Sequence, residues 1–256
     1  MSSKKNNWWK PKSLKDSERH FIDENDLDKL DVGNDFGSYK VMLATNDLEK
    51  SLIRSHNDIT PSFHVKAIKR ILGDFNPQKI YDIGCGLGYT AKEISKEYPC
   101  AEVFGVDISV DAIDFAKKNF PNCQFFAEAV DPENKDQFFR ADLIFAFGFY
   151  PFTRTSSLDD HQQYIAHLTN ELSERGKLVI FQRWDVPESL SANFKEIVNS
   201  FPDLKFELYT MPIKTIGKFV RSTFLANIVS EIARPILRTF TSLEFGKNKA
   251  LVISKD

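Results

Sequence analysis

The sequence of 256 residues is poor in cysteine, and it has no apolar run long enough to span a membrane. Its 3 cysteines, Cys85, Cys100 and Cys123, form no CxxC pair, so neither a disulfide framework nor a structural zinc site is expected. The longest apolar-rich stretch, residues 143–152, is about half a membrane span. The N-terminus has positive charge without an apolar run after it, which is not the pattern of a secretory signal. We therefore expect a cytoplasmic protein.

An excess of positive charge is also missing. The chain has 34 Lys and Arg against 36 Asp and Glu, a formal net charge of −2. A protein that grips nucleic acid mainly through its phosphates needs a basic surface, so a nucleic-acid partner is not expected. Hydrophobic residues make up 42% and charged residues 27%, which is an ordinary globular composition with enough apolar material for one large core.

From about residue 60 onward, short apolar stretches alternate with amphipathic ones. This alternation predicts an α/β fold in which a mostly parallel sheet has helices on both faces. The expected strands are residues 79–83, 101–106, 123–126, 141–147, 177–182, 205–209 and 250–254. Helices are expected from Thr60 to Gly73, from 90 to 97, from 109 to 119, from Ser157 to Gly176 and around 190–197.

Two segments depart from this alternation. Residues 1–59 form an N-terminal arm, which is either a solvated tail or a lid that folds Trp8 and Trp9 over a ligand. Residues 60–256 form the main domain, interrupted at 212–245 by an apolar and basic insertion before the last strand. We expect this insertion to be a helical cover for the cleft or a dimer contact. Peripheral attachment to a membrane through a basic amphipathic helix is the alternative.

The few glycines gather in one loop. Of 11 glycines, Gly84, Gly86 and Gly88 fall within five positions, between a predicted strand and a predicted helix. Such a loop lets the backbone approach a ligand, and the free amides at the start of the helix favour an anionic group. No Gly-Lys-Ser/Thr follows, which excludes a phosphate-binding P-loop. Tyr89 stands where a GxGxxG dinucleotide fingerprint needs its third glycine.

The spacing GxGxG, with Asp82 two residues before the first glycine, resembles motif I of the class I S-adenosylmethionine-dependent methyltransferases. A second match is Asp107, 19 residues after Gly88 at the end of the next strand, where a carboxylate can accept both ribose hydroxyls of a cofactor. The resemblance implies that Ile108 packs on the adenine. It also implies that Glu128, in place of the family's usual aspartate, lies near the adenine amino group.

The resemblance implies a doubly wound, mostly parallel sheet of seven strands. It implies S-adenosylmethionine as cofactor and S-adenosylhomocysteine as product. The cofactor-binding residues that it indicates are Asp82, Gly84, Cys85, Gly86, Gly88, Asp107, Ile108, Glu128, Ala129 and Phe147.

The acceptor is expected at the carboxyl ends of the fourth and fifth strands. His161, in the first turn of the helix after the fourth strand, is the best candidate for a base, and the alternative is a histidine that only packs. Tyr150 and His56 are further catalytic candidates. The candidate substrate-binding residues are Arg154, Arg183 and Trp184. We find no compact cluster of acidic residues and histidines near these strand ends, so we expect no catalytic metal.

The sequence favours an enzyme that methylates an oxygen of a small molecule, such as a sugar, a nucleotide-linked compound or a natural product. The Asn/Asp-Pro-Pro-Tyr/Phe motif of the N6-adenine and glutamine methyltransferases is missing, which speaks against those acceptors. The alternatives are an RNA or protein methyltransferase, or a non-catalytic adenosylmethionine-binding partner of another protein. A homodimer is compatible with each of these functions.

Overall fold

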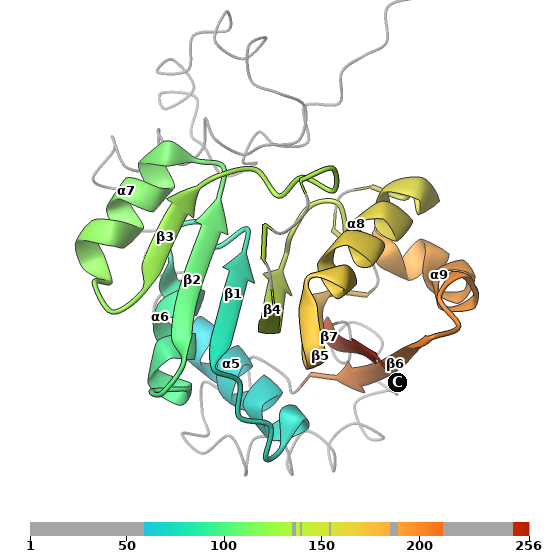
Figure 1. Cartoon of the computed structure of the whole chain (residues 1–256), viewed down its shortest axis with the longest axis horizontal. Coiled ribbons are helices and arrows are strands. Elements are labelled where there is room, and N and C mark those ends of the chain that lie inside the picture. Colours follow the sequence, from blue (N-terminus) through green and yellow to red (C-terminus); the bar gives the residue numbers. More distant parts are fainter. Residues whose placement is uncertain are drawn as a thin grey trace, which may run out of the picture.

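A seven-stranded sheet with the order β3-β2-β1-β4-β5-β7-β6 lies at the centre of the molecule (Figure 1). The structure is a computed structural model, and it describes residues 59–134, 137–138, 140–153, 155–184, 189–211 and 248–255. The strands are β1 (Lys79–Ile83), β2 (Glu102–Asp107), β3 (Gln124–Ala127), β4 (Ala141–Phe147), β5 (Leu172–Arg183), β6 (Leu204–Thr210) and β7 (Asn248–Lys255). Only β7 runs antiparallel to its neighbours β5 and β6. The predicted mostly parallel sheet of seven strands is therefore confirmed.

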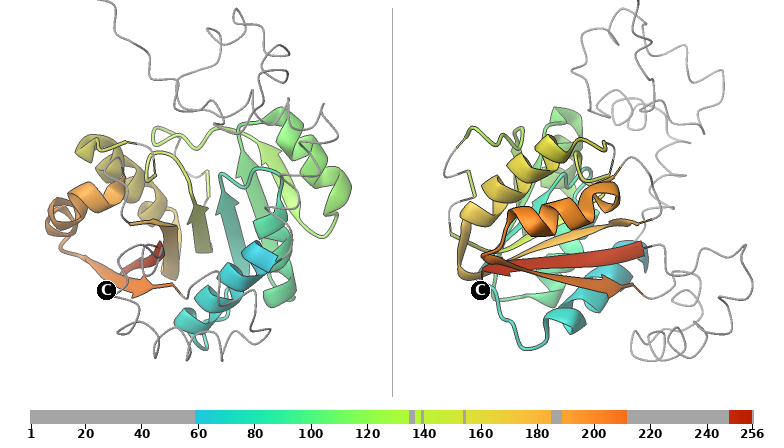
Figure 2. Two further views of the ribbon diagram at one scale, coloured as in Figure 1. Left: turned by 180° about the vertical axis from the view of Figure 1, so that it is seen from behind. Right: turned by 90° about the vertical axis from the view of Figure 1, so that its right-hand side faces the viewer.

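Helices cover both faces of the sheet (Figure 2). The helices are α5 (Ile59–Leu72), α6 (Tyr89–Glu97), α7 (Val110–Asn119), α8 (Leu158–Asn170) and α9 (Phe194–Ser200), with a 3₁₀ turn η1 (Leu190–Asn193) before α9. Ile68 and Ile94, from α5 and α6, pack in one hydrophobic cluster with α7. Ile165 and Ile197, from α8 and α9, pack in a second cluster on the other face. The doubly wound arrangement predicted from the alternation is confirmed.

The strand order reverses between β1 and β4. From β1 the chain proceeds through β2 to β3 at one edge, and it then crosses back to β4 on the other side of β1. In open α/β sheets, the loops that diverge at such a point leave a crevice at the carboxyl ends of the strands, where ligands bind. The glycine loop between β1 and α6 lies at this point.

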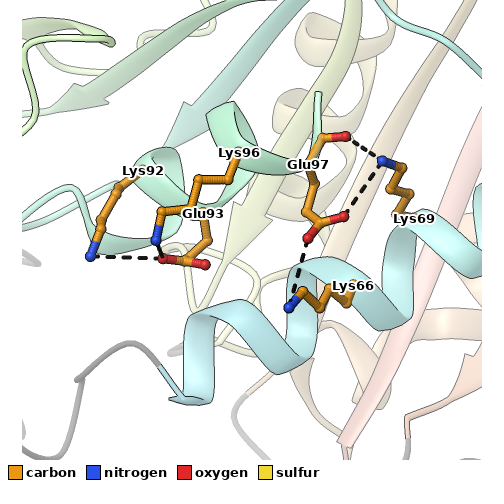
Figure 3. A network of polar contacts seen from close by, with 6 residues as sticks. All are labelled: Lys66, Lys69, Lys92, Glu93, Lys96 and Glu97. Carbon is orange, nitrogen blue, oxygen red and sulfur yellow. Dashed lines mark hydrogen bonds and ion pairs between the residues drawn. The ribbon is translucent and has the colours of Figure 1, made fainter. Parts of the chain in front are cut away.

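Ion pairs tie α5 to α6 (Figure 3). Glu97 of α6 lies 3.9 Å from Lys66 Nζ and 3.5 Å from Lys69 Nζ, and Lys69 also donates to the backbone carbonyl of Glu97. Within α6, the buried carboxylate of Glu93 lies 2.6 Å from Lys96 Nζ. The lysines are largely exposed, so each pair contributes little stability alone. Together they set the position of α6, the helix that follows the glycine loop.

Gly176 has a different role from the one the sequence predicted. The expected helix from Ser157 to Gly176 is wrong at its end, because α8 ends at Asn170 and β5 already begins at Leu172. Gly176 lies inside β5, where the register against β4 shifts. A Cβ atom there would lie 2.7 Å from the carbonyl oxygen of Ala141. The glycine is needed for this close approach of two backbones, and it does not terminate a helix.

The expected arm and lid at 1–59 and the insertion at 212–245 lie outside the described residues, apart from the first residue of α5. The described residues that flank the second segment are hydrogen-bonded to each other, since the Met211 amide donates to the Asn248 carbonyl at 3.0 Å. This contact lies at the edge of the sheet where β5 ends. No helix of the described residues has the length and apolar character needed to cross a membrane.

Candidate active site

The glycine loop turns sharply at the carboxyl end of β1. Gly84, Gly86 and Gly88 have φ values of 67°, 51° and 80°, in the left-handed region that favours glycine. The amides of Gly84 and Cys85 both donate to the carbonyl of Val106, at 2.8 and 3.1 Å, and so tie the loop to β2. Gly88 is the N-cap of α6, so the first free amides of this helix lie at the loop. The loop thus presents backbone donors at the switch point of the sheet.

Gly88→Ala is expected to destabilise the protein by roughly 2–4 kcal/mol, from backbone strain combined with overpacking. A Cβ at this position would lie 2.8 Å from the Ala116 side chain and 2.9 Å from the Phe125 ring. Gly73→Ala is the matched control, because φ there is also positive, at 62°, but nothing lies within 4 Å of the added carbon. Urea unfolding of both variants measures the difference. Equal losses would show that packing against Gly88 is unimportant.

Asp107, the last residue of β2, holds two loops together. Its Oδ2 accepts a hydrogen bond from the Gly86 amide at 2.9 Å, and its Oδ1 accepts one from the Ser109 amide at 2.9 Å. A carboxylate has about four acceptor positions, so it can accept hydroxyl groups in addition to these amides. The structure thus places this carboxylate between the glycine loop and the start of α7, and its binding to ribose stays a prediction.

Asp82, at the end of β1 two residues before Gly84, is a buried acid. Its side chain is 1% exposed, and neither carboxylate oxygen has a hydrogen-bond partner among the described residues. Burial raises the pKa of this carboxyl well above its ordinary value, and the charge of Asp107 raises it further, whereas the Ala91 backbone lowers it. A buried carboxylate of this kind is costly unless a cationic group pairs with it. The amino group of an adenosylmethionine bound in the loop would supply that charge.

Cys85, in the middle of the loop, is buried. Burial and the negative charges of Asp82 and Asp107 raise the pKa of its thiol well above the ordinary value. The thiol therefore stays protonated and is a poor nucleophile. Cys85 contributes to the site through its backbone amide and its packing.

Apolar side chains are exposed beside Asp107. Ile108 is 38% exposed and Phe126 on β3 is 39% exposed. The carboxyl ends of β2 and β3 thus present the apolar surface that an adenine needs. Glu128 and Ala129 follow β3 and are also exposed, and the Glu128 amide donates to the Asp107 carbonyl at 3.0 Å. Sequence reasoning missed Phe126, although it alternates with the buried Phe125 along β3.

Phe147 ends β4 in a stack of aromatic rings. Its ring centroid lies 5.5 Å from that of Phe145 and 5.0 Å from that of Phe181 on β5. His64 of α5 packs on this stack, 4.4 Å from Phe181 and 6.3 Å from Phe147 between ring centroids. Sequence reasoning missed His64. Its i+4 spacing to the buried Ile68 places it on the inner face of α5, which is the signal that could have identified it.

The expectation that His161 points into the cleft is wrong. Its side chain is 0% exposed, and both ring nitrogens are engaged. Nε2 donates to the Pro151 carbonyl at 3.2 Å, and Nδ1 accepts from the Asn193 side-chain amide at 3.3 Å. A neutral imidazole has one donor and one acceptor, and both are used here. Because His161 ties the loop after β4 to η1, we treat it as a positioning residue and no longer as the base.

We expect His161→Leu to lower the free energy of unfolding by about 2–4 kcal/mol, because the buried carbonyl of Pro151 and the half-buried amide of Asn193 lose their hydrogen bonds. Affinity for S-adenosylhomocysteine should stay unchanged.

Burial lowers the pKa of His161 in the folded state below 6.5. The unfolded chain therefore binds more protons just below pH 6.5, and the stability of the wild type falls as the pH falls through that window. The leucine variant should lose part of this slope in urea titrations at several pH values. Lost turnover at unchanged stability would contradict the positioning role.

Of the remaining catalytic and substrate-binding candidates, the structure describes Tyr150 and Trp184. Tyr150 is partly buried in the loop after β4, and burial together with the charge of Asp160 raises the pKa of its hydroxyl. It is therefore a hydrogen-bond donor at neutral pH. Trp184 is partly buried just after β5, with its ring against Phe194 at 5.2 Å and 77°. His56, Arg154 and the side chain of Arg183 lie outside the described part of the chain.

The structure thus brings the cofactor candidates together at the ends of β1 and β2, and it places Phe147, Tyr150 and Trp184 along the same edge at β4 and β5. Within the described ranges, no group of three His, Cys, Asp or Glu side chains is arranged to hold a metal ion.

Comparisons with known proteins find similarity to methyltransferases. A family model described as a methyltransferase domain matches residues 81–178. The malonyl-[acyl-carrier protein] O-methyltransferase of Anoxybacillus flavithermus is 33% identical over 103 residues, which are 40% of this chain and 38% of that protein. The trans-aconitate 2-methyltransferase of Escherichia coli is 32% identical over 105 residues, 41% of this chain and 39% of that protein. The match thus spans about two fifths of the length of these relatives.

Solved structures share the fold over a longer range. A TehB-like SAM-dependent methyltransferase from Corynebacterium glutamicum has a TM-score of 0.54 at 19% identity, over 81% of this chain and 94% of that chain. The plantazolicin methyltransferase BpumL, in complex with a triazolic desmethylPZN analogue and SAH, has a TM-score of 0.56 at 18% identity, over 85% of this chain and 94% of that chain.

Proposed function

We propose that the chain is a class I S-adenosylmethionine-dependent methyltransferase, and that it transfers a methyl group from S-adenosylmethionine to an oxygen of a small molecule. The match of residues 81–178 to a methyltransferase domain supports this proposal. One observation carries this proposal. The glycine loop is held by the carboxylate of Asp107 and covers the unpaired, buried carboxylate of Asp82. These two carboxylates are hydrogen-bond acceptors, and they fit a ligand that offers a sugar diol and a cation together.

Each part of the loop has a role in holding the cofactor. Asp107 would accept hydrogen bonds from the ribose hydroxyls, and Asp82 would pair with the ammonium group. The amides at the start of α6 would bind the carboxylate of the methionine end. Ile108 and Phe126 would contact the adenine. When bound, the sulfonium supplies an electrophilic methyl group together with its leaving group.

Methyl transfer needs little more than positioning. The carbon–sulfur bond breaks as the carbon–oxygen bond forms, the sulfonium becomes a neutral thioether, and any proton on the acceptor oxygen passes to water. Tyr150 could donate a hydrogen bond to the acceptor, since its hydroxyl stays protonated. Trp184, Arg183 and Arg154 are proposed to contact the acceptor. The Anoxybacillus relative is an O-methyltransferase, which supports oxygen as the methylated atom.

The test has two stages. Calorimetry with S-adenosylmethionine and S-adenosylhomocysteine should show binding of both. Protein incubated with methyl-labelled cofactor and fractionated small metabolites should then label a sugar, a nucleotide-linked compound or a natural product. Label in RNA or protein instead would favour those acceptor classes. Cofactor binding without transfer to any fraction would favour a non-catalytic partner protein, and the absence of cofactor binding would overturn the proposal.

We propose that this activity resides in the cytoplasm, where the free cysteines Cys85, Cys100 and Cys123 stay reduced.

A further inference from the structure

Gln182, near the end of β5, is a buried amide without hydrogen bonds. Its side chain is 3% exposed, and neither its amide oxygen nor its amide nitrogen has a partner among the described residues. Buried side-chain amides in native proteins nearly always have partners, so an unpaired one calls for an explanation. Gln182 lies at the carboxyl edge of the sheet, where the acceptor of a transferred group is expected. It is therefore a candidate for contact with a ligand.

The direction of the side chain follows from the alternation along β5. Leu178 and Ile180 pack into the cluster with α8 and α9, whereas Val179 and Phe181 pack into the cluster with α5. Because successive residues of a strand point to opposite faces, Gln182 belongs to the α8 and α9 face. It continues the row of Leu178 and Ile180 beyond the apolar core.

A cation and an aromatic ring share this position. Lys249 of β7 is the direct partner of Gln182 in the antiparallel ladder, so the two side chains are neighbours on one face. Lys249 Nζ lies 5.7 Å from the ring centroid of Trp184, and the Phe194 ring makes an edge contact with this ring at 5.2 Å between centroids. No carboxylate of the described residues lies within ion-pair distance of Lys249. An amide, an ammonium and an indole therefore lie close together here, and both polar atoms of the amide lack a hydrogen-bond partner among the described residues.

We propose that Gln182, Lys249 and Trp184 form a subsite for a carboxylate of the acceptor that carries a neighbouring hydroxyl group. The Lys249 ammonium and the Gln182 Nε2–H donate to the carboxylate oxygens, and Gln182 Oε1 accepts from the hydroxyl. Trp184 provides the apolar wall. The inference rests on the proposed function, because β5 lies two strand spacings, about 10 Å, from β1 and its glycine loop. A small acceptor anchored here would reach the loop.

Three matched probes separate the parts of this subsite. Lactate has both the carboxylate and the hydroxyl, propionate lacks the hydroxyl, and lactamide lacks the charge. Each is titrated into the full chain saturated with S-adenosylhomocysteine while the side-chain amide signals of Gln182 are followed by NMR. We expect lactate to shift these signals at the lowest concentration, propionate to require several-fold more, and lactamide to require the most.

Variants assign each preference to one residue. Lys249→Met should abolish the preference for lactate over lactamide, since it removes the cation. Gln182→Leu should abolish the preference for lactate over propionate, and here the methyl signals of a leucine-labelled sample report binding. Lys205→Met is the control, because Lys205 on the neighbouring strand β6 is paired with Glu207 at 3.2 Å and should leave all three titrations unchanged.

Failure of this subsite is distinguishable from failure of the proposed function. If S-adenosylhomocysteine binds but lactate does not shift the Gln182 amide signals, the subsite is wrong and the methyltransferase proposal stands. Equal effects of lactate and lactamide would also overturn it, as would a Lys249→Met variant that keeps the wild-type preference. If S-adenosylhomocysteine does not bind, the proposed function is wrong. Lactate titrated into the free protein then tests the subsite separately.

Discussion

Asp107→Ala is expected to lower the affinity for S-adenosylhomocysteine by at least about 100-fold. Two hydrogen bonds that ribose hydroxyls donate to a charged carboxylate contribute roughly 1.5–3 kcal/mol each. The substitution also removes the acceptor for the Gly86 and Ser109 amides, which hold the glycine loop and the start of α7 in place. Both losses weaken the binding of S-adenosylhomocysteine. Isothermal calorimetry on the purified chain measures the change.

Two further variants show whether the effect is specific to Asp107. Asp107→Asn keeps one acceptor oxygen and the size of the side chain, so its affinity should lie between that of the wild type and that of the alanine variant. Asp114→Ala removes an exposed acid on the following helix α7 and should leave binding unchanged. An Asp107→Ala protein that is folded and binds with nearly wild-type affinity would refute the assignment of the ribose-binding acid.

Local signals carried most of the fold prediction. The strands predicted at 79–83 and 141–147 coincide with β1 and β4, because each is a compact apolar run with clear ends. The helix expected from 109 to 119 is also confirmed, and Ser109 is its N-cap because its side chain accepts the Ala112 amide. Asp107 could be identified because its distance from the glycine loop is set by one helix and one strand. These features depend on neighbours in the sequence.

Features that depend on distant neighbours could not be predicted. The burial of His161 follows from its contacts with Pro151 and Asn193, and nothing in the helical pattern of α8 indicates a partner on η1. The pairing of Gln182 with Lys249 joins strands that are separated by more than sixty residues, and only the register of β5 and β7 reveals it. The interpretation of Gly176 as a helix stop failed for the same reason, since its constraint comes from a carbonyl on β4.

Asp82→Asn is expected to stabilise the cofactor-free protein at neutral pH and to weaken cofactor binding. Burial, with the charge of Asp107, raises the pKa of Asp82 in the folded state above the value of about 3.9 in the unfolded chain. Between those two pKa values the folded protein binds more protons than the unfolded chain. The free energy of unfolding of the wild type therefore falls as the pH rises through this window, and it stays lower above it. An asparagine has no such charge to bury, so the advantage of the variant should grow from pH 4 upward.

The same carboxylate should favour the ligand that pairs with it. Loss of the charge is expected to weaken S-adenosylhomocysteine binding by roughly 10- to 100-fold, because a buried hydrogen bond to a charged group contributes about 1.5–3 kcal/mol. Asp142→Asn is the control with opposite behaviour. Its carboxylate accepts the Gln78 and Lys79 amides at 2.9 and 3.1 Å at the other end of the sheet, so its loss should destabilise the fold and spare the affinity. Urea unfolding across pH and calorimetry at pH 7 measure both variants. Destabilisation by Asp82→Asn together with unchanged affinity would mean that Asp82 has only a structural role, because a charge held for a ligand must cost stability until that ligand arrives.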